Sequence, residues 1–449
     1  MQFDSLYFAA AAMPAVLISY LFPGKFRNWF FLVLSLLFVL TFSYSALIVL
    51  GALILLTYGF SILLETRKSK AILSAACALI GGLLVFFRFY DSGAGTIFDH
   101  ALPVSIIVPV GVSFYTLNAI SYLADLYTGK LKQRLPFVTI ALFLSFFPTV
   151  TSGPLLRAGE FAKEAEKEKP LRYETIRDGF VCMLVGYVMK LAVAGRCALL
   201  VNHVYGDSSL RGFPVVLAVI AYSLEIYADF AGYSLIAKGL ASAIGFVIPD
   251  NFQQPYFSAS IREFWRRWHM SLSSWLRDYI YIPLGGSHGT RLFKFRNLIL
   301  TFLVWGLLHA LFQIGEDVLS SVTGKKSFDS LTSRVITFAL VSIAWVFFTS
   351  PGVRDALAIL GRCISLENYG SLFTSTIAGW GLDARNWCFL IAGLLVVGVI
   401  DFNEYQSHSM LEWFRKKHWW EQLILVWGLL LLILFSLNLS GGEFIYMQF

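Results

Sequence analysis

The residue with the clearest chemical potential is His309, which lies deep inside an uncharged segment. The run of residues 297–310 contains no Asp, Glu, Lys or Arg. An ionisable side chain within such a run is costly in a membrane, so a functional role is the natural hypothesis. A neutral imidazole can take a proton near neutral pH, as acyl transfer to a hydroxyl requires. The alternative is a histidine that only packs, by hydrogen bonding to a neighbouring helix.

A second histidine lies in a segment of helical spacing between residues 260 and 276. Ser260 and Glu263 have the spacing of a capping box, which predicts a helix start. The polar stripe of this helix spans about 60° and comprises Arg262, Arg266, His269 and Ser273. The opposite face carries Ile261, Phe264, Trp265, Trp268, Leu272, Trp275 and Leu276. We expect one amphipathic helix at the membrane interface, with His269 on its wet face, either solvated or positioning a reacting group.

Two acidic residues, Glu225 and Asp229, stand four positions apart in an apolar helical segment and therefore share a face. Such a pair can be a proton relay or an ion site. The alternative is that both acids pair with basic residues of adjacent helices and fix the packing. We favour this second interpretation, because no ladder of acids continues through other spans. Candidate partners are Lys190, Arg196 and Arg88.

The composition excludes soluble and disordered classes of protein. Of 449 residues, 57% are hydrophobic and 14% are charged, whereas soluble domains carry about 25% charged residues. The net charge of +7 comes from short basic clusters beside apolar runs, which is typical of cytoplasmic loops rather than of a nucleic-acid surface. The sequence therefore predicts a polytopic membrane protein that does not bind nucleic acid.

Other chemistries find no support in the sequence. The five cysteines are scattered without a CxxC pair, so neither a disulfide framework nor a metal site is predicted. There is no phosphate-binding P-loop, no HExxH and no GxSxG motif. The first apolar run has no basic region before it, so we expect a retained first span rather than a signal peptide.

Apolar runs long enough to be considered as spans recur along the whole chain. They lie near residues 5–22, 28–43, 45–64, 71–89, 102–124, 136–150, 178–200, 213–247, 296–315, 331–349, 387–402 and 422–440. We expect roughly ten to twelve crossings plus re-entrant or interfacial helices. Basic clusters follow the first, third and fifth runs, at residues 25–27, 67–70 and 130–134. Placing all three in the cytoplasm puts the N-terminus outside.

Several unusual motifs resemble the membrane-bound O-acyltransferase family. They are Ile226-Tyr-Ala-Asp-Phe-Ala-Gly-Tyr-Ser234, Asn251-Phe-Gln-Gln-Pro-Tyr256, Glu263-Phe-Trp-Arg-Arg-Trp-His-Met-Ser-Leu-Ser273 and Trp275-Leu-Arg-Asp-Tyr-Ile-Tyr-Ile-Pro-Leu-Gly-Gly286. The resemblance is strongest to the bacterial branch with the alginate O-acetyltransferase membrane subunits and teichoic-acid D-alanyl transferases. It extends over nearly the whole chain, including Pro109-Val-Gly-Val-Ser-Phe-Tyr115 and the terminal Phe444-Ile-Tyr-Met-Gln-Phe449.

The resemblance implies an all-α helical body around a tunnel, and it implies the site residues. His309 matches the essential histidine of the family, and His269 matches its second histidine. Residues that would line or support the tunnel are Trp305, Trp265, Trp268, Arg262, Arg266 and Asp229. Two positions depart from the family pattern. The usual Gly-Leu-Trp-His-Gly reads Gly306-Leu-Leu-His-Ala310, which leaves the acyl group open, and Leu235 replaces the usual Asp after Gly-Tyr-Ser.

The resemblance further implies a single membrane domain over residues 1–449, in a bacterial inner membrane. Its parts would be N-terminal helices (1–135), a catalytic core (136–330) and C-terminal helices (331–449). The donor would be acetyl-CoA or another acyl thioester, with no bound cofactor. The acceptor would be an exported polysaccharide or a periplasmic or surface relay protein of the SGNH type. Alternatives are D-alanyl transfer from a carrier protein to teichoic acid, a proton-coupled transporter of acyl or glycan precursors, and a catalytically silent scaffold subunit.

Overall fold

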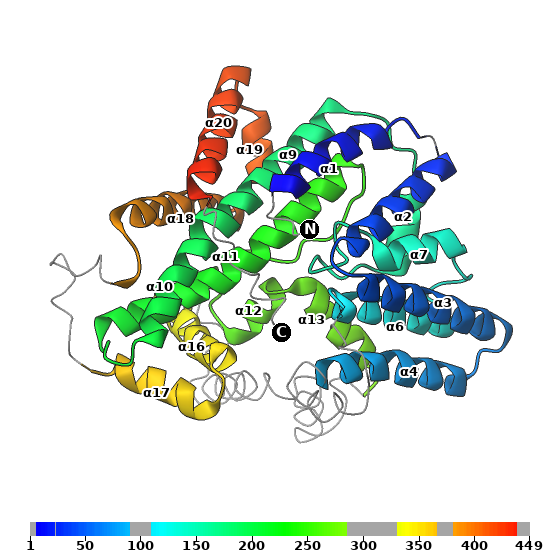
Figure 1. Ribbon diagram of the computed structural model, residues 1–449, viewed down its shortest axis with the longest axis horizontal. Coiled ribbons are helices and arrows are strands. Elements are labelled where there is room, and N and C mark those ends of the chain that lie inside the picture. Colours follow the sequence, from blue (N-terminus) through cyan, green and yellow to red (C-terminus); the bar gives the residue numbers. More distant parts are fainter. Residues whose placement is uncertain (1–5, 23, 90–108, 285–329, 366–379, 438–449) are drawn as a thin grey trace. The chain divides into compact units, whose positions relative to one another are not determined.

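The computed structural model describes most of the chain, namely residues 6–22, 24–89, 109–284, 330–365 and 380–437. All regular structure in these ranges is helical (Figure 1). By its internal contacts the chain divides into two compact units. The first unit contains Met1–Phe180 and Ala237–Pro249, and the second contains Val181–Ile236 and Asp250–Phe449. The protein is an all-α polytopic membrane protein, as the sequence predicts.

The first unit is built from the N-terminal helices. They are α1 (Leu6–Ser19), α2 (Gly24–Leu40), α3 (Tyr44–Thr66), α4 (Lys70–Phe89), α6 (Val112–Thr128), α7 (Phe137–Ser145) and α8 (Ala158–Glu166), followed by the start of α9 (Tyr173–Tyr187). Arg27, from the first basic cluster, is 6% exposed. Its guanidinium donates to the carbonyl oxygens of Lys169, at 2.8 Å, and Ile244, at 2.9 Å. This residue therefore ties α2 to two later segments of the same unit.

The second unit contains the remaining elements. They are η2 (Val188–Ala194), α10 (Gly195–Gly206), most of α11 (Phe213–Ala243), η3 (Pro255–Phe257), α12 (Ile261–Arg267), α13 (Met270–Leu276), η4 (Arg277–Tyr281), α16 (Leu331–Thr349), α17 (Val353–Cys363), α18 (Ala384–Tyr405), α19 (Met410–Arg415) and α20 (Trp419–Ser436). Elements η2 and η4 are π-helical, and η3 is a single 3-10 turn. The π-helix η2 joins α9 to α10 without a break.

Within the described ranges, seven helices are long and apolar enough to cross a membrane. They are Tyr44–Thr66, Lys70–Phe87, Tyr173–Gly206, Phe213–Ala243, Leu331–Thr349, Ala384–Tyr405 and Trp419–Ser436. Each overlaps a run expected from the sequence. The run 296–315 lies outside the described residues, so the total of ten to twelve crossings stays a prediction.

The candidate run 136–150 forms only the nine-residue helix α7. Nine residues rise about 14 Å, less than half of a bilayer core. The helix ends at Ser145, three residues before Pro148. Proline has no backbone N–H to continue the helical ladder, which explains the early end. Helix α7 is therefore too short to cross a membrane by itself.

The two long helices of the second unit cross at a pair of glycines. A Cβ built on Gly232 of α11 would lie 2.7 Å from the Gly186 carbonyl oxygen of α9, and a Cβ on Gly186 would lie 2.5 Å from the Gly232 carbonyl oxygen. Side chains at either position would therefore push the two backbones apart. Small residues at such crossings allow close packing of helices within a membrane.

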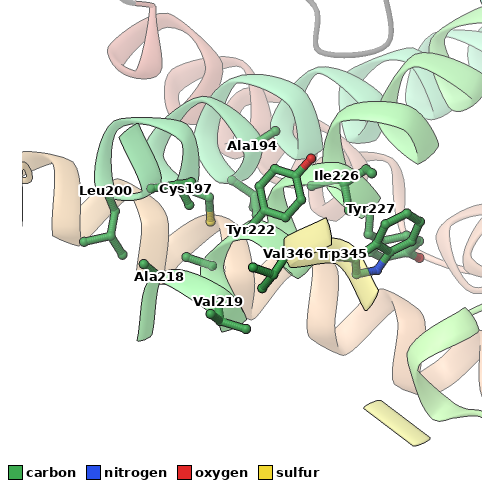
Figure 2. Close-up of a cluster of buried hydrophobic side chains, with 14 of the residues drawn as sticks. Ala194, Cys197, Leu200, Ala218, Val219, Tyr222, Ile226, Tyr227, Trp345 and Val346 are labelled. Atoms are coloured by element: carbon green, nitrogen blue, oxygen red, sulfur yellow. The ribbon is translucent and has the colours of Figure 1, made fainter. Parts of the chain in front are cut away.

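The core of the second unit lies where α10, α11 and α16 come together (Figure 2). Figure 2 shows Cys197 and Leu200 facing Tyr222 and Val219, with Val346 and Trp345 beside them. The cluster continues to Phe264 and Trp268. It therefore links the span helices to the short helix α12 and to Trp268, which directly precedes the motif histidine.

Candidate functional site

His269 lies at a break between two short helices. Helix α12 ends at Arg267, Trp268 has an extended backbone, and α13 begins at Met270. His269 itself adopts the left-handed conformation, with φ 42° and ψ 53°. For a residue with a Cβ this conformation costs about 1–2 kcal/mol. Strain of this kind persists only where the surroundings enforce it, and it is common at functional sites.

The prediction of one continuous helix over residues 260–276, with His269 on its wet face, is therefore wrong. The helix start was predicted correctly, because the Ser260 Oγ accepts from the Glu263 backbone N–H at 3.1 Å. The Glu263 carboxylate accepts from the Ala259 N–H, one residue earlier than in a capping box. The break after Arg267 turns the imidazole inward, so that His269 is only 4% exposed.

Asn251, which precedes η3, holds the histidine in this position. Its side-chain Oδ1 lies 2.9 Å from His269 Nδ1. The same oxygen accepts from the backbone N–H of Ser271 at 3.3 Å and from its hydroxyl at 2.8 Å. The amide nitrogen of Asn251 donates to the Ser234 hydroxyl on α11 at 3.3 Å. We call these four residues, Asn251, His269, Ser271 and Ser234, the histidine network.

Two backbone hydrogen bonds lie on either side of His269. The Met270 N–H donates to the Asn251 carbonyl, and the Gln253 N–H donates to the Arg267 carbonyl, both at 2.9 Å. The loop before η3 therefore pairs with the chain at the α12–α13 break. Gln254 also has a left-handed backbone, with φ 43°. The two strained residues thus stand at the two ends of one paired segment.

The imidazole is surrounded by apolar groups. The ring of Phe230 on α11 meets it edge to face, with the centroids 4.7 Å apart. Burial lowers the pKa of His269 from its ordinary 6.5 to about 3, because a charged imidazolium would lose its hydration. His269 is therefore neutral at physiological pH and has one protonated ring nitrogen.

Trp268, which directly precedes the histidine, is 2% exposed. Its ring lies 4.9 Å from Trp345 of α16, 5.0 Å from Phe252 and 5.4 Å from Phe264. Trp265 is half-buried and packs edge to face on Phe264. These aromatic contacts fix the position of the break relative to α11 and α16.

The basic residues of α12 divide into two kinds. Arg262 and Arg266 are exposed, as predicted for the polar stripe. Arg267, to which the sequence analysis gave no role, forms an ion pair with Glu263 at 2.7 Å and lies over the ring of Tyr405. Thus α12 presents two exposed guanidinium groups next to the buried histidine network.

Asp229 is part of a buried ion pair with Lys190 of η2, with Nζ and Oδ1 2.6 Å apart. This confirms Lys190 as a partner. Arg196 donates instead to the Leu191 carbonyl, and the Arg88 side chain lies outside the described residues. One turn before Asp229, Glu225 is 5% exposed, and its Oε2 has no hydrogen-bond partner within the described part of the chain.

His309 and Trp305 lie in the range 285–329, outside the described residues. Among the described residues, the structure brings His269 together with Trp268, Asn251, Ser271 and Ser234. Asn251 begins the motif Asn251–Tyr256, and no role was predicted for it from the sequence. A usable signal is an asparagine followed by Pro255 at the start of a connection between apolar segments, where an amide side chain often serves backbone groups.

Comparisons with known proteins support one family. The model of the membrane-bound O-acyltransferase family matches residues 130–314, a range that contains the histidine network. A probable alginate O-acetylase AlgI of Pseudomonas syringae is 30% identical over 348 residues, 73% of this chain and 66% of that protein. A peptidoglycan O-acetyltransferase of Helicobacter pylori is 30% identical over 68% of this chain and 66% of its own length. A teichoic acid D-alanyltransferase of Bacillus subtilis is 32% identical over 41% of this chain and 47% of its own length.

Proposed function

The chain belongs to the membrane-bound O-acyltransferase family, and from this premise we propose that it transfers an acyl group, acetyl in the first instance, to hydroxyls of an exported polysaccharide. The observation that supports this best is the histidine network. A buried, neutral imidazole, held by an asparagine on a strained backbone, lies inside the range that matches the family. Packing alone would not require a left-handed histidine.

The reaction we propose begins with proton removal by His309. As general base it takes the proton of an acceptor hydroxyl, and the hydroxyl oxygen attacks the carbonyl carbon of an acyl thioester. The carbon–sulfur bond then breaks, and the thiolate leaves as a thiol after taking up the proton. His269 positions a reacting group beside this base. Trp305, Trp265 and Trp268 support the substrate tunnel.

The donor in this proposal is a thioester, acetyl-CoA or an acyl carrier. Both donors carry phosphate groups, and the exposed guanidinium groups of Arg262 and Arg266 suit phosphate. Asp229 acts indirectly, through its ion pair with Lys190, by holding η2 against α11. The acceptor is the polysaccharide itself or a relay protein of the SGNH type outside the cell.

For the membrane setting we propose a bacterial inner membrane and an external N-terminus. The basic clusters at 25–27, 67–70 and 130–134 then face the cytoplasm, where thioesters are made. We further propose that residues 1–449 act as one membrane domain, with the core 136–330 containing both motif histidines.

A second candidate is D-alanyl transfer to teichoic acid. It is favoured by the 32% identity to a D-alanyltransferase and by the altered surroundings of His309, which leave the acyl group open. A proton-coupled transporter or a silent scaffold subunit would not itself transfer acyl groups. For either of them, replacing His309 should therefore leave the acyl content of the glycan unchanged.

The experiment that tests the proposal compares His309→Ala with wild type, a deletion and a matched control. His408→Ala suits as the control, since His408 is exposed and lies in a loop. The measurement is the O-acetyl content of surface glycans, with membrane levels of each variant shown to be equal. We expect His309→Ala to match the deletion and His408→Ala to match wild type. Full acetylation with His309→Ala would refute the catalytic role, and a deletion that lowers only D-alanyl content would support the second candidate.

A further inference from the structure

We propose that Asn251 is a positioning residue that holds His269 in the tautomer protonated at Nδ1, so that Nε2 meets its reaction partner as a hydrogen-bond acceptor. The part of this inference that concerns the reaction rests on the proposed acyl transfer. The tautomer itself does not depend on that function. In this tautomer, the Nε2 atom of His269 accepts a hydrogen bond from an O–H or N–H group and does not donate one to a developing oxyanion.

The orientation of the Asn251 amide decides the tautomer. Amide oxygen and nitrogen atoms are hard to tell apart by shape, so the partners must identify them. The Ser271 backbone N–H, which can only donate, points to the same atom of Asn251 that contacts His269. That atom must be the oxygen. An amide oxygen only accepts, and therefore the proton between Asn251 and His269 belongs to Nδ1.

Asn251 is anchored well enough to impose this choice. It is 2% exposed. Its amide nitrogen donates to Ser234 of α11, and its backbone carbonyl accepts from Met270. A flipped amide would set its NH₂ group against the Ser271 N–H, a contact between two donors. Reversal would thus leave a buried donor unpaired, which costs about 1–3 kcal/mol.

The charge state makes the tautomer matter. A charged imidazolium donates from both nitrogens, whereas a neutral ring has one donor and one acceptor. His269 is neutral at physiological pH because its burial lowers its pKa to about 3. Because the Nδ1–H group donates to Asn251 Oδ1 and keeps its proton, Nε2 carries a lone pair. The left-handed backbone then fixes the direction of that lone pair, since the ring cannot rotate without breaking the bond to Asn251.

The first test is nitrogen NMR on the full-length protein, labelled with ¹⁵N in its histidine rings and placed in nanodiscs. The His269 signals are those lost in His269→Gln. We expect a protonated-type Nδ1 and an unprotonated-type Nε2 in the wild type. Asn251→Leu removes the acceptor and shifts at least half of the population to the Nε2–H tautomer, whereas Asn251→Asp keeps Nδ1 protonated.

The matched control is Asn118→Leu, the same substitution at a buried asparagine of the first unit, which should leave the His269 signals unchanged. An Nε2–H tautomer in the wild type would overturn the proposal, even if Asn251→Leu failed to fold. An unchanged tautomer in folded Asn251→Leu would overturn it as well.

The second test separates positioning from folding and from the proposed function. In an acetyl-transfer assay, we expect Asn251→Leu to lower kcat by about 10–100-fold, with KM changed by less than about threefold. Asn251→Asp should restore at least about a tenth of wild-type kcat, because it keeps the acceptor oxygen. An unchanged kcat together with the shifted tautomer would refute the positioning role. A wild type that shows the expected tautomer but transfers no acyl group would instead refute the proposed function.

Discussion

The second unit contains two buried polar groups of residues that both contact α11, and they are built in opposite ways. The histidine network consists of neutral side chains on an irregular, strained backbone, and Asn251 Oδ1 accepts from three donors. The Lys190–Asp229 pair consists of full charges on helical backbone, and Oε2 of the neighbouring Glu225 has no hydrogen-bond partner among the residues that the structure describes. The neutral network costs backbone strain and gains fixed directions for hydrogen bonds. The charged pair costs desolvation and gains a fixed register between helices.

This difference suits the two roles that we propose for these groups of residues. Chemistry needs a side chain with a defined tautomer and direction, which a loop held by an asparagine supplies. Packing in a membrane needs two helices that cannot slide, which an ion pair supplies. The comparison makes specific predictions, because breaking a charge pair and loosening a neutral network should affect different measurements.

The largest effect is expected from Lys190→Met. It leaves the Asp229 carboxylate buried without its cation, which destabilises a protein by about 3–5 kcal/mol. The measurement is the free energy of unfolding in mixed micelles. The double variant Lys190→Met/Asp229→Leu removes both charges and should recover most of this loss. If the double variant is no more stable than the single one, the pair does not act as a packing device.

A smaller effect is expected from Trp268→Leu. Trp268 fills the space between Trp345, Phe252 and Phe264, so truncation to leucine leaves a cavity and costs about 2–3 kcal/mol. Unfolding in the same micelles measures this loss. The matched control is Trp265→Leu, where the side chain is half-buried and the loss should be smaller. Equal losses at both positions would show that the packing under His269 is not special.

The neutral histidine predicts a pH dependence of stability. The pKa of His269 is about 3 in the folded protein and lies near 6.5 in the unfolded chain, so the unfolded state takes up the proton first on acidification. Stability should therefore fall below about pH 6.5, by up to about 2 kcal/mol at pH 5. His269→Gln, which has no such proton to bind, should lose less stability over this range. Parallel curves for the two proteins would contradict a buried neutral imidazole.

The smallest effect is expected from Glu225→Gln. This change keeps the shape, removes a carboxylate one turn from Asp229 and breaks no ion pair that the described part of the chain contains. The free energy of unfolding should change by less than about 1 kcal/mol, the worth of one typical hydrogen bond. Asp229→Asn, the same change one turn along α11, should cost several times more because it removes the anionic partner of a buried Lys190. Similar losses for both variants would make Glu225 a member of the charged pair.

The sequence could predict features that depend on neighbouring residues. Runs of apolar residues located the seven candidate spans of the described ranges, and Ser260 with Glu263 located the start of α12. The pairing of Asp229 with a basic residue followed from the cost of a lone charge in an apolar helix. The spans and the helix start each have their whole cause within one segment, and the need of Asp229 for a counter-charge is local too, although its partner Lys190 lies 39 positions earlier.

The sequence could not predict the position of His269, because its cause is remote. Helical spacing placed the residue on a wet face, yet its ring turns inward to an asparagine 18 positions earlier. The spacing of apolar residues contains no information about such a distant partner. It also did not indicate that the helix breaks at Trp268 and His269. The role of His309 stays a prediction from the family resemblance.

The π-helix η2 has a consequence for how the chain tolerates changes in length. A π-helical turn contains one residue more than an α-helical turn, so everything that follows it is rotated by about 100° relative to a continuous α-helix. Deleting one residue within Val188–Ala194 would remove this extra residue, convert the segment to α-helix and leave α10 facing its present neighbours. A one-residue deletion in the α-helical turns before or after it has no extra residue to remove, so it would rotate everything that follows by about 100°. We therefore expect Val188–Ala194 to tolerate the loss of one residue better than the flanking turns of α9 and α10.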